Sequence, residues 1–215
     1  MGSRPVSVLA VLVTSLTACL LSARQVPAGG SSSKTKQKPE QHGKASAPAA
    51  SAEGAYHNAV FGFTYRVPYG WVERTREMQE EEDNDPSKAQ LLLAVFERPP
   101  EVTGDSVNSA VIIASESVAS YPGLKTAADY MGPLSELTTS KGFKVVHEPY
   151  EFPPGTKRFV RSDFVKGLGK LAMHQSSLAL LENRSIVSFT FIGGSADEVD
   201  ELVEKLSLGA SARPR

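Results

Sequence analysis

Large apolar side chains are almost absent from residues 24–53, and this absence limits where a folded domain can form. The segment reads RQVPAGGSSSKTKQKPEQHGKASAPAASAE and consists mainly of Gly, Ser, Pro, Ala, Lys and Gln. Such a composition cannot bury enough apolar surface to offset the entropy cost of ordering the chain. We therefore predict a disordered tether over residues 24–54, one folded domain over residues 55–208 and a frayed tail over residues 209–215.

The overall charge and the cysteine content exclude several classes of function for this domain. The net charge is −1 and the isoelectric point is about 6.4. No global basic field attracts nucleic acid, so we expect no nucleic-acid partner. The single cysteine, Cys19, lies outside residues 55–208. The domain therefore has no disulfide, zinc–thiolate cluster or thiol nucleophile, and we expect neither a metal nor a cofactor.

Residues 1–23 have the organisation of a secretory signal peptide. Arg4 precedes an apolar run over residues 6–16, in the order of the charged and hydrophobic parts of such a peptide. The run is shorter than the ~20 residues that a membrane-spanning helix needs. An uncleaved anchor helix is the alternative.

A short motif at the end of this run resembles the lipobox of bacterial lipoproteins. The motif is Leu16-Thr17-Ala18-Cys19. In that family the cysteine sulfur receives a diacylglycerol, and cleavage makes the cysteine the new N-terminus. The resemblance implies lipidation of Cys19 and a membrane-anchored domain in the cell envelope, facing the periplasm or the extracellular side. Simple secretion is the alternative, although cleavage after Ala18 or Ala23 would place a bulky leucine where a small residue is preferred.

The tether is weakly basic, because it contains Lys34, Lys36, Lys38 and Lys44. These side chains could attract anionic head groups or cell-wall polymer, but a solvated spacer is the simpler interpretation. A flexible coil of ~30 residues reaches roughly 30 Å, which holds the domain near the membrane but off its surface.

The domain itself shows strand patterns separated by short turns. Tyr and Phe alternate with polar residues at its start, and the continuous apolar run over residues 90–97 is typical of a strand covered on both faces. A hairpin turn is expected at residues 166–169. The predicted strands are residues 55–60, 62–67, 90–97, 109–118, 143–150, 157–165, 171–181 and 186–192. Short connections favour an antiparallel β-sheet flanked by few helices, which is the α+β class.

Two helices are expected in the same domain. Residues 126–140 have apolar side chains at helical spacing, and Gly132-Pro133 predicts a kink or a restart within them. The last helix begins with a capping box formed by Ser195 and Glu198, and its apolar stripe extends to Leu206.

The opening strands of the domain resemble a known family. Residues 61–65 read FGFTY, and Val67-Pro68 and Gly70-Trp71 follow. An aromatic strand that enters a Pro-x-Gly-Trp turn is similar to the opening of the Mog1/PsbP-like superfamily, and the closing meander and helix are similar too. The resemblance implies a Mog1/PsbP-like sandwich with an accessory or binding role, and it supplies no catalytic residues. As the only tryptophan, Trp71 is expected to anchor the core.

One group of polar residues could support chemistry. If the turn between the two long strands is symmetric, Arg161 lies opposite His174, and Asp163 lies diagonal to His174 on the same face. An Asp–His pair can orient an imidazole for base catalysis, with a nucleophile from Ser162 or Ser176. The simpler interpretation is an ion-pair network on a solvent-exposed sheet face.

The remaining sequence features favour binding over catalysis. The acidic segment from Glu77 to Asp85 lacks the ligand order of a calcium loop, so we expect a solvated loop rather than an ion site. The sequence contains no nucleophile elbow, phosphate-binding loop or zinc-protease motif. We therefore expect a non-catalytic binding or accessory module with a protein or small-molecule partner. The alternatives are a structural or assembly subunit of an envelope complex and a hydrolase that uses Asp163 and His174.

Overall fold

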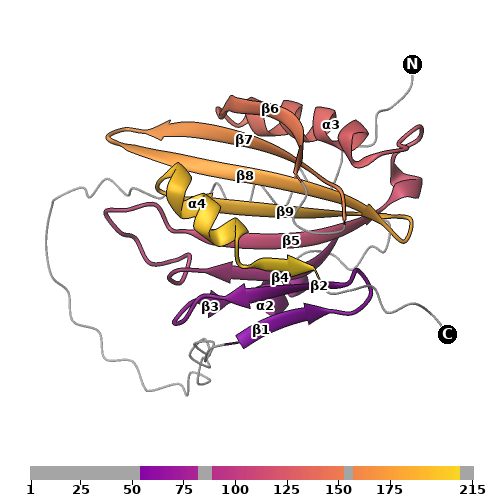
Figure 1. Ribbon diagram of the computed structural model, residues 1–215. Coiled ribbons are helices and arrows are strands. Elements are labelled where there is room, and N and C mark those ends of the chain that lie inside the picture. Colours follow the sequence, from indigo (N-terminus) through magenta and orange to yellow (C-terminus); the bar gives the residue numbers. More distant parts are fainter. Residues whose placement is uncertain (1–53, 82–88, 153–156, 209–215) are drawn as a thin grey trace, which may run out of the picture.

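The computed structural model describes residues 54–81, 89–152 and 157–208. The elements within these ranges are β1 (Gly54–Asn58), β2 (Phe63–Val67), β3 (Val72–Glu73), α2 (Thr75–Glu81), β4 (Gln90–Phe96), β5 (Ala110–Ser117), the 3-10 turn η1 (Val118–Ser120), α3 (Ala127–Ser140), β6 (Lys144–Phe152), β7 (Phe159–Leu168), β8 (Leu171–Glu182), β9 (Ser185–Gly193), α4 (Ala196–Val203) and β10 (Leu206–Leu208). Figure 1 shows the strands in antiparallel sheets, with α4 lying over the larger one. The predicted α+β class is confirmed.

The larger sheet has seven strands in the order β3-β4-β5-β9-β8-β7-β6. Its inner strands come from the apolar runs of the sequence, and β4 and β9 are buried along almost their whole length. β6 forms one edge of the sheet, and most of its side chains are exposed. The polar residues singled out in the sequence lie near this edge, on β7 and β8.

A smaller sheet contains the predicted opening hairpin. β2 pairs with β1 on one side and with β10 on the other. In β10, Leu206 lies opposite Tyr65, and the backbone N–H of Arg66 donates to the carbonyl of Lys205 across 3.1 Å. The prediction that Leu206 belongs to the last helix is therefore wrong. α4 ends at Val203, because the following residues satisfy the open edge of β2.

The core lies on both faces of the larger sheet. Val111 and Ile113 of β5 face one cluster, which also contains buried side chains of α4, β2 and β10. Ala110, Ile112 and Ala114 alternate with them and face the other side. On that side α3 packs against β8 and β9. Alternate side chains along the strands thus face opposite sides of the larger sheet. α4 and the smaller sheet cover one side, and α3 covers the other.

α3 is one helix that contains Pro133. The predicted restart at Gly132-Pro133 is therefore wrong. Proline in a helix interior costs about 3 kcal/mol. The helix nevertheless continues, because buried side chains on both sides of the proline pack against the sheet: Tyr130, Met131 and Leu134. Its N-cap, Thr126, forms a reciprocal capping box with Asp129.

The turn between β7 and β8 is tighter than predicted. Leu168 lies opposite Leu171, so the turn consists of Gly169 and Lys170 rather than residues 166–169. Gly169 has φ of +65°, a conformation that glycine adopts without a steric penalty. The strand register is therefore shifted by an even number of residues, and each side chain stays on the predicted face but meets a different partner.

The start of α4 is held by hydrogen bonds from two directions. The hydroxyl of Ser195 accepts from the backbone N–H of Glu198 across 3.1 Å, as the predicted cap requires. The carboxylate of Glu198 accepts from the N–H of Gly194 across 2.8 Å and from the hydroxyl of Ser109, instead of returning to Ser195. The reciprocal half of the predicted capping box is therefore wrong, because the carboxylate accepts instead from Gly194 and from the hydroxyl of Ser109, just before β5.

Several predicted features lie outside the described residues. These are the signal peptide with Cys19, the tether up to residue 53, residues 82–88 of the acidic segment and the tail from residue 209. No helix in the described part of the chain combines the length and the apolar character that crossing a membrane requires.

Candidate functional site

Arg161 and Asp163 form an ion pair at the centre of the candidate site. Both lie on β7 and point to the same face, where Nε of Arg161 donates to Oδ1 of Asp163 across 2.7 Å. Nη2 of Arg161 donates to Oδ1 of Asp200 on α4 across 2.5 Å. The side chains of Arg161 and Asp163 are only 11% and 13% exposed, whereas that of Asp200 is 55% exposed. The two predicted residues therefore form a mostly buried pair, which α4 completes from outside.

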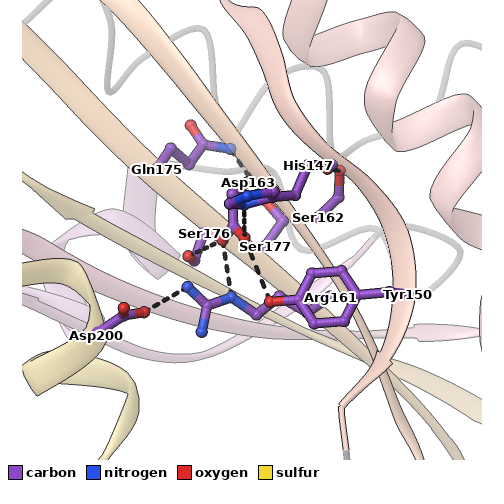
Figure 2. Close-up of polar contacts among 9 residues, drawn as sticks. All are labelled: His147, Tyr150, Arg161, Ser162, Asp163, Gln175, Ser176, Ser177 and Asp200. Carbon is purple, nitrogen blue, oxygen red and sulfur yellow. Dashed lines mark hydrogen bonds and ion pairs between the residues drawn. The ribbon is translucent and has the colours of Figure 1, made fainter. Parts of the chain in front are cut away.

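Asp163 accepts hydrogen bonds from several neighbours at once (Figure 2). Its Oδ1 accepts from Arg161 and from the hydroxyl of Ser176. Its Oδ2 contacts Nδ1 of His147 at 3.0 Å and the hydroxyl of Tyr150 at 3.4 Å. Burial separates this carboxylate from most of the surrounding water, and these hydrogen bonds compensate for that loss. We call the following residues the polar cluster: His147, Tyr150, Arg161, Asp163, Ser176 and Asp200.

An irregularity in β6 brings His147 and Tyr150 to the same carboxylate. Their spacing in a regular strand would point them to opposite faces. The pairing of β6 with β7 shifts between Val145 and His147 and again between His147 and Tyr150. Bulges of this kind redirect side chains. The hydroxyl of Ser162, on the opposite face of β7, supports this geometry by donating to the carbonyl of His147 across 2.8 Å.

His174 lies close to the polar cluster but has different strand partners from those predicted. It lies opposite Val165 rather than Arg161, while Ser176 lies directly opposite Asp163. Asp163 and His174 are still diagonal neighbours, and both line the same cleft. Within the described residues, however, the imidazole that contacts Asp163 is that of His147 and not that of His174. The predicted register is wrong, because the turn is centred between Gly169 and Lys170, two residues later than the predicted centre between Gly167 and Leu168.

The polar cluster, apart from Tyr150, lines a small cleft between α4 and strands β6 to β8. The cleft has a volume of about 80 Å³. Its remaining lining residues are Val146, Phe164, His174, Gln175, Ala196 and Val199. Polar groups therefore form one part of the cleft, and apolar side chains of β6 and α4 form another.

Burial and the neighbouring carboxylates shift the pKa values of two members of the cluster, Tyr150 and Arg161. Burial, followed by the charge of Asp163, raises the pKa of Tyr150, so that its hydroxyl remains a donor at neutral pH. Burial alone would lower the pKa of Arg161, but hydrogen bonds to Asp200 and Asp163 outweigh burial and raise that pKa. Arg161 therefore stays charged and neutralises one of the two carboxylates.

The other residues singled out in the sequence are not part of this cleft. Trp71 is 8% exposed and packs in the core cluster beneath the smaller sheet. Cys19 lies outside the described residues, as does the acidic segment after Glu81. Among the described residues, no group of three or more His, Cys, Asp or Glu side chains could hold a metal ion.

Comparison with protein-family models gives no match for this sequence, and neither does comparison with curated proteins. Solved structures do match. The chain is 13% identical to the cyanobacterial PsbP (CyanoP) of Synechocystis sp. PCC 6803, covering 79% of this chain and 98% of that one, with a TM-score of 0.47.

Two further matches have lower scores. LpqN of Mycobacterium tuberculosis, described as involved in cell envelope biogenesis, is 10% identical over 74% of this chain and 91% of its own, with a TM-score of 0.40. The Ran-binding protein Mog1p of Saccharomyces cerevisiae is 10% identical over 74% of this chain and 87% of its own, with a TM-score of 0.40. The antiparallel meander β6–β9 followed by α4, which the resemblance implied, is present. All three TM-scores lie below 0.5, so the Mog1/PsbP-like resemblance stays a prediction.

Proposed function

We propose that this protein is an exported, lipid-anchored binding module of the cell envelope, and that the cleft beside α4 is its binding site. The observation that carries the proposal is the polar cluster, in which one mostly buried carboxylate orients a set of side chains at an opening to solvent. Groups that are already positioned lose little entropy when a partner binds.

The surroundings of the cleft also support binding. Large apolar side chains that stay exposed on a folded domain can mark an interaction site. Val146 lines the cleft and is 50% exposed, and Tyr150, on the same strand but outside the lining, is 39% exposed. Apolar side chains beside a few convergent polar groups are typical of a binding site.

Hydrolysis is a second candidate function, because His147 and Asp163 have the contact that orients a general base. A nucleophile would have to reach the other ring nitrogen, Nε2, of His147. In the described part of the chain, however, Ser176 donates to Asp163, and Ser162 donates to a backbone carbonyl on the opposite face. The arrangement therefore favours a site that holds a partner over one that transforms it.

Site-specific photo-crosslinking tests the proposed binding site. A photoreactive amino acid replaces Val146, which lines the cleft, or Val102, which is equally exposed at 50% but lies in the loop between β4 and β5. We expect a discrete adduct from position 146 in intact cells and none from position 102. Adducts of equal yield from both positions, or from neither, would remove the cleft as the binding site.

The lipid anchor has a separate test. The native protein and its Cys19→Ser variant are compared by intact mass and by partitioning between membrane and aqueous fractions. We expect a diacylglycerol mass on the native protein and membrane retention that the variant loses, because the cysteine sulfur is the acyl acceptor. If both proteins are soluble and cleaved elsewhere, the protein is secreted and not anchored.

A further inference from the structure

The contact between His147 and Asp163 determines which ring nitrogen is open to a ligand. An ionised carboxylate only accepts hydrogen bonds, so Nδ1 of His147 is the donor in this 3.0 Å contact. In a neutral imidazole, Nε2 then has a lone pair and no proton. Because the side chain of His147 is 65% exposed, this acceptor is available to an incoming donor.

The charged groups of the cleft offer a second open acceptor. Arg161 is the only cation of the polar cluster when His147 is neutral, and it is paired with two carboxylates, those of Asp163 and Asp200. Oδ1 of Asp200 accepts from Arg161, and no other described residue engages its Oδ2. Exposed acids at Asp197 and Glu201 on α4 add to the negative field. An anionic ligand would be repelled here, and a cation would be attracted.

The shape and the apolar part of the cleft restrict the kind of cation. A volume of about 80 Å³ is well below the ~300–1,000 Å³ of small-molecule sites, so one side chain fits better than a whole ligand. Lys and Arg have an apolar stem and a charged end. The exposed side chain of Val146 can cover such a stem. The ring of Tyr150 packs edge-on with His147, their centroids 6.3 Å apart, so an aromatic side chain lies beside the imidazole.

We infer that the cleft binds a lysine or arginine side chain presented by a partner polypeptide. Its charged group donates to Oδ2 of Asp200, a second basic side chain of the partner donates to Nε2 of His147, and the stem in the cleft lies along Val146 (Figure 2 shows Asp200 and His147 on either side of Arg161 and Asp163). This inference rests on the proposed binding function and adds the chemistry of the partner.

Fluorescence anisotropy with the full-length chain tests the inference. The probes are a labelled peptide of alternating glycine and lysine and a matched peptide of alternating glycine and glutamate. The variants are Asp200→Asn and His147→Ala, each of which removes one proposed acceptor. Glu204→Gln is the control, because it removes the same charge from an exposed residue just after α4 that does not line the cleft.

We expect the lysine peptide to bind in preference to the glutamate peptide. Asp200→Asn and His147→Ala should each weaken binding by about tenfold or more, which corresponds to the loss of one hydrogen bond to a charged group. Glu204→Gln should change affinity by less than about twofold, because it alters only an exposed charge. Asp200→Asn breaks an ion pair of Arg161 and could impair folding. His147→Ala leaves the ion pairs of Arg161 intact, so it tests the inference independently.

Two results would overturn the inference. One is stronger binding of the glutamate peptide, and the other is equal weakening by Asp200→Asn and Glu204→Gln, which would indicate attraction to general surface charge. If position 146 forms its crosslinked adduct while the lysine peptide does not bind, the binding function stands and the cationic partner is excluded. Loss of the adduct would instead remove the binding function itself.

Discussion

The Phe189→Ala variant is expected to have a free energy of unfolding about 3–5 kcal/mol lower than that of the native protein. Phe189 on β9 is fully buried. Its ring centroid lies 5.1 Å from that of Phe63 on β2 and 5.5 Å from that of Phe159 on β7. Truncation therefore creates a cavity where the smaller sheet packs on the larger one. Equilibrium unfolding in urea, followed by fluorescence and circular dichroism, measures the loss.

Tyr69→Ala is the matched control, because it also truncates an aromatic side chain. Tyr69 is 80% exposed in the turn between β2 and β3. Its removal should change the free energy of unfolding by no more than about 0.5 kcal/mol. Similar losses for the two variants would show that the contact of Phe189 with Phe63 and Phe159 does not hold the two sheets together.

The sequence predicts the elements of this fold better than their partners. Alternation of apolar and polar residues identifies the long strands, because every second side chain is apolar in a strand that is buried on one face. It does not identify β10, since Leu206–Leu208 is too short to show a period, and its pairing partner β2 lies far away in the sequence. Local patterns contain no information about which distant edge a short segment will complete.

Register is a second limit of prediction from sequence. A turn centred on Gly169 and a turn over residues 166–169 both place Asp163 and His174 on one face, because both registers differ by an even number of residues. The face could therefore be predicted, but the partner of Asp163 could not. Only the left-handed conformation of Gly169 selects the two-residue turn.

The candidate site could be predicted only in part. The predicted hairpin register places Arg161 and Asp163 on one face beside His174, and the structure pairs the first two with each other. The sequence does not predict that His147 and Tyr150 join them, because regular alternation assigns these two side chains to opposite faces. Pro149 between them is the signal that could have indicated a bulge, since proline in a strand is confined to edges and bulges. Asp200 reaches Arg161 from a helix, and no sequence pattern predicts such a contact.

Arg161→Met is the second substitution expected to have a large effect, a loss of about 3 kcal/mol in the free energy of unfolding. Methionine retains much of the apolar stem but removes the guanidinium. The carboxylate of Asp163, which is 13% exposed, then loses its only charged partner when His147 is neutral. Hydrogen bonds from Ser176 and Tyr150 remain, so the loss should stay near the lower end of the range for breaking a buried ion pair. Urea unfolding at neutral pH measures the effect.

Arg158→Met separates this effect from the general loss of an arginine. Arg158 precedes β7 and pairs with Glu151 across 3.6 Å, but the two side chains are 86% and 74% exposed. Water already solvates both charges, so breaking this pair should cost no more than about 0.5 kcal/mol. If Arg161→Met is as mild as Arg158→Met, the carboxylate of Asp163 does not depend on the guanidinium. The polar cluster would then be a surface network and not the buried framework that orients His147 and Tyr150.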